Sequence, residues 1–143
     1  MTSPVANSSQ PLELDIKKVQ DIVQELKNNH FTTTKLRKFF GQVISINQKL
    51  QFGDTISHEL YSQIQMLEPR FVYLMAREKF ITTQRDFNTK QDITIKKLPE
   101  FTKYIEDTLK TIVHQRATLK HNFKHFALHL EAIVAFFKQY EKE

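Results

Sequence analysis

The sequence has 143 residues, a length typical of one domain, and 21 Lys and Arg against 16 Asp and Glu give a formal net charge of +5. It has no Cys, which excludes disulfide scaffolds, cysteine-ligated zinc and thiol nucleophiles and fits a reducing cytoplasm. Only two Gly argue against Gly-rich phosphate loops and a turn-dense β fold. No run approaches the roughly 18 apolar residues of a membrane span, so we expect a basic, helix-rich cytoplasmic protein without membrane contact.

The beginning of the chain predicts a tail followed by a helix. Residues 1–11 contain two prolines and little to bury, which predicts a disordered tail, and residues 12–143 are expected to form a single helical-bundle domain. From Leu12 the apolar residues alternate spacings of four and three, which predicts a first helix over residues 12–28.

A second helix is predicted over residues 34–50. The threonines at positions 32–34 are candidate N-caps, because their hydroxyls can accept the first unpaired amide protons of a helix. Gly41 lies inside this helix and suggests that a neighbouring element approaches closely there.

The middle of the chain predicts one helix, a loop and another helix. A helical pattern runs from Ile56 to Met75 through Pro69, where we expect a kink or a break because proline cannot donate an amide proton. Residues 82–97 are polar without a lasting period, which predicts a mobile loop. Pro99 suits the first turn of the helix that follows.

The last helix, over residues 120–141, is apolar on two sides. Besides its main stripe it has Leu128, Ala132, Ala135 and Phe136 on the opposite side, so it is either central in the bundle or shared with another molecule, and we favour the central position. The chain is thus expected to be an all-α, compact bundle of about five helices. The predicted core includes Leu36, Phe40, Val43, Leu60, Ile64, Phe71, Leu130, Ile133, Val134 and Phe137.

No pattern in the sequence indicates catalysis. There is no Gly-x-Ser-x-Gly elbow, no phosphate-binding Gly-x-x-x-x-Gly-Lys and no paired carboxylate constellation, so we expect no enzymatic activity and no cofactor. Four histidines at spacings of seven, four and four would share one stripe if the helix is continuous: His114, His121, His125 and His129. One-turn spacing can chelate a metal, but zinc sites combine ligands from more than one element, so we predict no metal and favour a polar stripe that faces either solvent or a polyanion.

Positive charge is concentrated in two acid-free stretches. Residues 27–49 contain five basic residues and no acid, and residues 108–130 contain Lys110, Arg116, Lys120 and Lys124. In the third helical pattern Arg70, Tyr73 and Arg77 line up, and arginines flanking a tyrosine suit a phosphate backbone with a ring available for stacking. The alternative is an ordinary solvated face, in which Arg77 simply pairs with a carboxylate.

Three segments of the chain contain distinctive motifs. Phe31–Phe40 contains a threonine-rich cap followed by Leu-Arg-Lys, Phe71–Glu78 contains Tyr-x-x-x-Arg-Glu, and Leu130–Lys138 contains Glu-Ala-x-Val-Ala-aromatic-aromatic-Lys. In this order they resemble the Csm small-subunit family of type III-A CRISPR effector complexes. The resemblance covers most of residues 31–143 and thins between residues 79 and 122.

The resemblance implies a non-catalytic helical subunit that stacks into a short filament, beside other type III-A subunits, along paired guide RNA and target RNA. Such a subunit contacts sugar and phosphate independently of base sequence, since the guide supplies specificity. The basic residues within or beside the matching segments are the expected RNA contacts: Lys35, Arg37, Lys38, Arg70 and Arg77. The alternative is a protein–protein adaptor bundle whose basic faces meet acidic partners without direct RNA binding.

Overall fold

The structure, a computed structural model, describes residues 15–53 and 55–141. Its elements in chain order are α1 (Ile16–Asn28), α2 (Thr33–Phe52), α3 (His58–Gln65), α4 (Leu67–Arg77), β1 (Ile81–Arg85), β2 (Asp92–Lys96), α5 (Pro99–His114), the 3₁₀ helix η2 (Arg116–Thr118) and α6 (Leu119–Glu141). The predicted helical bundle is confirmed. The tail predicted at residues 1–11 and the first residues of the first predicted helix lie outside the described residues.

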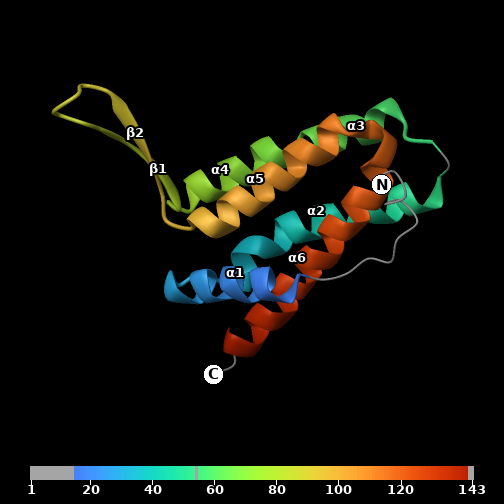
Figure 1. Ribbon diagram of the computed structural model, residues 1–143, viewed down its shortest axis with the longest axis horizontal. Coiled ribbons are helices and arrows are strands. Elements are labelled where there is room, and N and C mark those ends of the chain that lie inside the picture. The colour runs from blue at the N-terminus through green and yellow to red at the C-terminus, as the bar shows by residue number, and fades with distance from the viewer. Residues whose placement is uncertain (1–14, 54, 142–143) are drawn as a thin grey trace, which may run out of the picture.

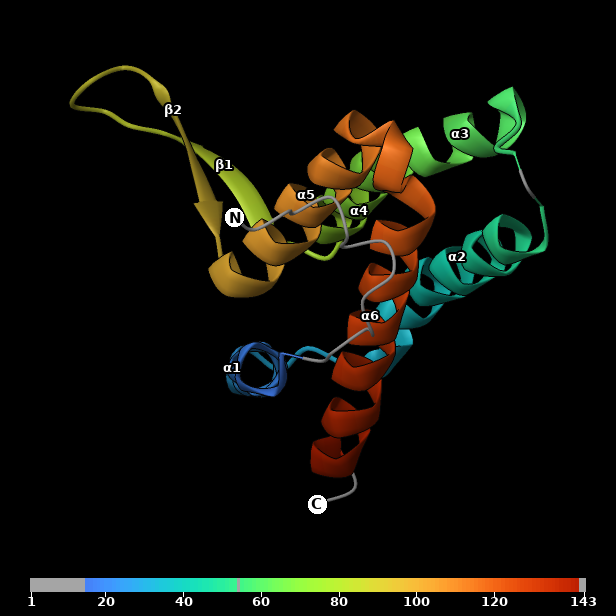
Figure 2. The same ribbon diagram turned by 45° about the vertical axis from the view of Figure 1, so that its right-hand side comes forward.

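Helix α6 is the central element of the bundle. It packs against α1, α2 and α5, and Figures 1 and 2 show it crossing α2 between the other helices. On its second apolar side Ala132 is buried and Phe136 is half-buried against the core, while Ala135 is exposed. The second apolar side is therefore largely covered within the chain, which confirms the central position.

The core is rich in phenylalanine rings. All ten predicted core residues are buried except Phe40 and Val134, which are half-buried at its edge. Phe39 points inward in place of Phe40, with its ring centroid 5.3 Å from that of Phe71. One residue turns a helix by about 100°, so the choice between adjacent phenylalanines depends on where the neighbouring helix lies.

Helices α1 and α4 end in the same way. His30 and Lys79 follow the two C-caps with φ values of 58° and 65°, and the amides of Phe31 and Phe80 donate to the carbonyls five residues earlier at 3.1 and 2.8 Å. This is the Schellman pattern, which turns the next residue back over its helix. It brings the Phe31 and Phe80 rings to 5.2 Å between centroids and so joins the two helix ends in the core.

The third predicted helix is broken at Met66 rather than at Pro69. Ser57 caps α3 by accepting the Leu60 amide at 3.1 Å, and Met66 ends α3 and precedes α4. Pro69 is the third residue of α4, where a missing amide proton costs nothing because the first turn has no intrahelical acceptor for it. The close approach expected at Gly41 is wrong, because no atom of a neighbouring element lies within 4 Å of the position that a Cβ would occupy there.

Residues 82–97 form an antiparallel hairpin, so the prediction of a segment without regular structure is wrong. Strands β1 and β2 pair from Ile81 with Lys96 to Arg85 with Asp92, and Figure 1 shows the hairpin projecting from the ends of α4 and α5. At its turn the Asp86 carboxylate accepts from the Asn88 amide and the Thr89 hydroxyl, which lowers the pKa of Asp86. The hairpin buries little of itself, so it leaves no strong burial pattern in the sequence.

A carboxylate of α1 caps the N-terminus of α5. The Glu25 oxygens accept the amides of Glu100 and Phe101, each at 2.9 Å, where unpaired amides and the positive end of the helix dipole meet. Pro99 begins α5 as predicted. This contact ties residues 75 positions apart and fixes α5 relative to α1.

Candidate nucleic-acid interface

Helices α2 and α4 pack together and leave a surface groove of about 580 Å³ between them. Four of the five expected RNA contacts line this groove: Lys35, Lys38, Arg70 and Arg77. Arg37, the fifth, is exposed on α2 and does not line it.

Each of the two helices contributes to the groove a stripe of three side chains, and the two stripes have the same spacing. Lys35, Lys38 and Gln42 lie at positions i, i+3 and i+7 of α2, and Arg70, Tyr73 and Arg77 repeat that spacing on α4. Residues so spaced share one helix face. Each stripe can be found in the sequence, but only the packing of α2 on α4 places them on opposite walls of one groove.

The charges in the groove are only partly neutralised. The Lys35 Nζ lies 3.6 Å from one Glu78 oxygen and the Arg77 Nε lies 3.5 Å from the other. Lys38 and Arg70 are exposed and have no ion pair with any described residue. Ion pairs at a protein surface typically contribute about 1 kcal/mol or less, and the half-buried Glu78 still borders solvent, so a polyanion can compete with it for Lys35 and Arg77.

The floor of the groove is apolar and partly aromatic. Tyr73 is 67 % exposed and Met66 46 % exposed, and both line the groove. The Arg77 guanidinium carbon lies 6.0 Å from the centre of the Tyr73 ring, a cation–π distance. The sequence identified Tyr73 but not Met66, which lies inside the single helical pattern over residues 56–75 and has no signal of its own. The sequence also left open that Arg77 pairs with a carboxylate, and the structure identifies that carboxylate as Glu78.

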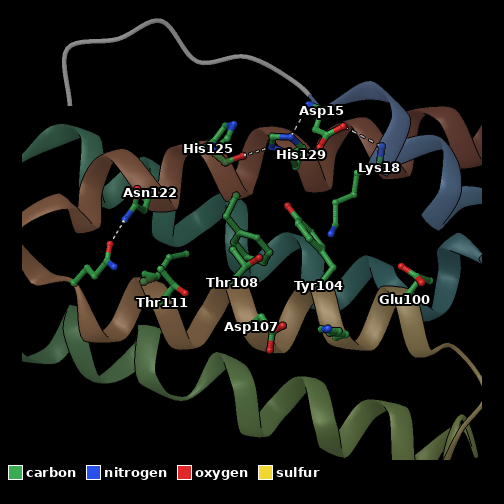
Figure 3. A pocket seen from close by; sticks show the side chains of 14 residues that line it. Asp15, Lys18, Glu100, Tyr104, Asp107, Thr108, Thr111, Asn122, His125 and His129 are labelled. Atoms are coloured by element: carbon green, nitrogen blue, oxygen red, sulfur yellow. Dashed lines mark hydrogen bonds between the residues drawn. The ribbon is translucent and has the colours of Figure 1, made fainter. Parts of the chain in front are cut away.

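His129, the last histidine of the predicted stripe, is held by hydrogen bonds at both ring nitrogens. The buried His129 accepts the Asp15 amide at Nε2, 2.9 Å away, and its Nδ1 lies 3.0 Å from the His125 carbonyl oxygen (Figure 3). An amide can only donate and a carbonyl can only accept, so the ring is neutral with its proton on Nδ1, and no lone pair is left for a metal. Burial lowers the pKa of His129. The solvated stripe is thus wrong for His129, which joins α1 to α6.

A second cavity, also of about 580 Å³, lies between α1, α5 and α6. Figure 3 shows Lys18 and Tyr104 pointing into it, with the Lys18 Nζ 5.7 Å from the centre of the Tyr104 ring. Burial raises the pKa of Tyr104. Lys18 and Lys103 share the lining with three carboxylates, those of Asp15, Glu100 and Asp107, so this cavity has no excess of positive charge. Among the described residues no group of three or more His, Cys, Asp or Glu could hold a metal ion.

The fold and groove define a basic helical bundle with a cation-lined surface between two of its helices. A family model described as Csm2 Type III-A matches residues 9–143. The chain therefore belongs to the Csm2 family, as its three matching segments predicted, and is a structural subunit of a type III-A CRISPR complex that contains other subunits. The comparison with curated proteins found no match, nor did that with solved structures. Among the described residues no helix is long and apolar enough to cross a membrane.

Proposed function

We propose that this chain is a non-catalytic cytoplasmic subunit that stacks in a short filament and contacts guide and target RNA through the groove between α2 and α4. Lys35, Lys38, Arg70 and Arg77 bind phosphate oxygens there, and Arg37 extends the contact along α2. Phosphate contacts fix position without reading bases, which is what a subunit on variable targets requires.

The observation that carries this proposal is the convergence of four cations from two helices on one groove. Lys38 and Arg70 face solvent without an ion pair to a described residue, so their charges are available to a ligand. The exposed Tyr73 ring adds a surface on which an unpaired base can stack whatever its identity.

The hairpin supports contact between copies. Its side chains include Phe87, which is 92 % exposed, and Ile93 and Ile95, which lie on one face of β2 with 45 % and 37 % exposed. Apolar side chains presented on a projecting arm can be buried by a neighbouring subunit, and a contact between two different surfaces of one chain continues from copy to copy.

The test is RNA binding by Lys38→Gln/Arg70→Gln across a salt series. We expect this variant to bind every RNA sequence more weakly by the same factor, and its salt slope to flatten by about 1.4 for a single strand, because two phosphate contacts are lost. The melting temperature should be unchanged, since neither side chain has an ion pair with a described residue.

The matched control is Lys103→Gln/Lys138→Gln, which removes the same charge from exposed positions outside the groove. It should retain nearly all of the affinity. Equal losses in the two double variants would show that net charge matters and that the groove does not. Arg37→Gln measures separately how far the RNA extends beyond the groove.

The apolar floor of the groove favours a second candidate function. Exposed Met66 and Tyr73 could receive an aliphatic or aromatic side chain of an acidic protein partner, as in an adaptor without RNA binding. Binding of a partner subunit that tolerates high salt, together with no measurable RNA affinity, would support the adaptor.

A further inference from the structure

A third hollow, of about 660 Å³, lies where the end of α2 and residues 55–56 meet the beginning of α6. Its charged and titratable lining residues are Arg116, Lys120, His121 and Lys124. No carboxylate is among the described residues that line it, and Asp54 lies outside the described part of the chain. The hollow is therefore lined by positive charge alone where the structure describes it.

Arg116 is held in place before any ligand arrives. Its guanidinium carbon lies 4.0 Å from the centre of the Tyr61 ring, and the Tyr61 hydroxyl donates to the Val113 carbonyl at 2.9 Å. Arg116 has no ion pair with a described carboxylate. A guanidinium stacked on an anchored ring keeps its plane while its edge donors stay available, which is the geometry that phosphate recognition requires.

The beginning of α6 adds two lysines and an uncompensated helix dipole. The Lys120 ammonium donates to the Gly53 carbonyl, and Lys124 is exposed one turn further along α6. The first turn of α6 contains no acidic residue, so nothing there offsets the positive end of the dipole. Lys110, from the same acid-free stretch, lies 3.5 Å from Glu68 instead and does not line the hollow.

This hollow is separate from the groove between α2 and α4. The two share no lining residue. Lys38 lines the groove and Gln51 the hollow, and thirteen residues of helix separate them by about 20 Å along the axis and about 140° around it. A ligand in one is thus not in the other unless it is long enough to pass around α2.

We infer that this hollow is a second phosphate-binding site, which takes a phosphodiester group of RNA through Arg116 and Lys124. The inference rests on the proposed function, because the ligand is the same RNA, but it assigns a different surface. One subunit then holds RNA at two positions on opposite sides of α2. Such two-point attachment raises affinity without reading base sequence, since both contacts are to the backbone.

The test compares Arg116→Gln/Lys124→Gln with the wild-type full chain in binding a 40-nucleotide single-stranded RNA across a salt series. We expect the salt slope to flatten by about 1.4 and the affinity at 0.1 M salt to fall roughly 10- to 30-fold, because two phosphate contacts are removed. The control is again Lys103→Gln/Lys138→Gln, which removes the same charge from exposed positions outside the hollow and should retain nearly all of the affinity. Melting temperatures verify folding, and Lys124→Gln alone avoids disturbing the Tyr61 stack.

Adding Lys38→Gln/Arg70→Gln separates failure of the inference from failure of the proposed function. Losses in both double variants that combine in the quadruple variant support the second site. A loss in the groove variant with wild-type binding by both Arg116→Gln/Lys124→Gln and Lys124→Gln overturns the second site and leaves the groove. No RNA binding by the wild type overturns both.

A titration with pyrophosphate tests whether the hollow binds a small phosphate compound instead of RNA. Pyrophosphate binding that depends on Arg116, together with unchanged RNA affinity of the Arg116 variant, also overturns the assignment to RNA.

Discussion

The groove between α2 and α4 and the cavity between α1, α5 and α6 are about equally large. They differ in whether the charged and polar groups that line them already have partners. In the cavity, His129 is bonded at both nitrogens and the carboxylates of Glu100 and Asp107 offset nearby lysines. In the groove, Lys38 and Arg70 have no ion pair with a described residue.

This difference teaches that charge without a partner is a better criterion than volume for choosing a candidate binding surface. A polar group that already has a partner must lose it before a ligand can bind, whereas an exposed cation loses only water and counterions. The cavity therefore serves the fold, since its hydrogen bonds join α1 to α6, and the groove is open to a partner. Four changes test this contrast.

The largest expected effect is a loss of stability caused by a substitution in the hydrophobic core. Phe137 is 2 % exposed and its ring lies 6.3 Å from that of Phe31. Phe137→Ala should lower the free energy of unfolding by about 3–5 kcal/mol, because the truncated side chain leaves a cavity. Urea unfolding measures this loss, and a change below about 1 kcal/mol would place Phe137 outside the core.

A smaller loss is expected when the contact between α1 and α5 is removed. Glu25→Ala leaves the Glu100 and Phe101 amides without their acceptor and should cost about 1–2 kcal/mol. Asp21→Ala, one turn earlier on the same helix, removes only an exposed ion pair with Lys17 and should cost less than about 0.5 kcal/mol. Equal melting temperatures for the two variants would argue against the cap.

The contact between Asp15 and His129 predicts a pH dependence. The pKa of His129 is lowered in the folded state from its ordinary value of 6.5, chiefly by burial, so the unfolded chain binds more protons just below that pH. Stability should therefore fall as the pH drops below about 6.5, by at most about 1.4 kcal/mol per pH unit. The backbone carbonyl of His125, which accepts a hydrogen bond from the ring, raises this pKa, as does the charge of Asp15, whereas a charge on the His125 ring lowers it.

His129→Gln isolates this dependence, because glutamine can still accept the Asp15 amide but does not titrate. Unfolding curves of the wild type and the variant between pH 5 and 7.5 should diverge as the pH falls, with the wild type losing more. Parallel curves would mean that protonation of His129 leaves the attachment of α1 intact.

The smallest effect is expected from Glu78, the one carboxylate among the described residues that line the groove. Glu78→Gln frees Lys35 and Arg77 and should raise RNA affinity roughly 2- to 5-fold at 0.1 M salt while shifting stability by less than about 0.5 kcal/mol. Glu106→Gln makes the same charge change at an ion pair with Lys96, outside the groove. A similar gain in both variants would attribute the effect to net charge.

The sequence by itself determined the helices, most of the core and the family. Leu36, Val43 and Leu50 recur at helical spacing because one stripe of α2 must be buried, and all three are buried. The same local rules identified Pro99 at the beginning of α5 and the two basic stripes of α2 and α4. Local spacing could not decide between Phe39 and Phe40, and the hairpin at residues 82–97 was missed because it buries little.

Only the tertiary structure decided which stripes meet. Lys38 and Arg70 line the same groove, and Arg116 and Lys124 line the same hollow beside the end of α2. His129 accepts a hydrogen bond from the amide of Asp15, 114 residues earlier in the chain. The physical reason is that periodicity specifies the face of one helix, whereas a groove, a paired charge or a tether depends on how two helices rotate and cross. That choice is made by the packing of the whole core and leaves no local mark on either segment.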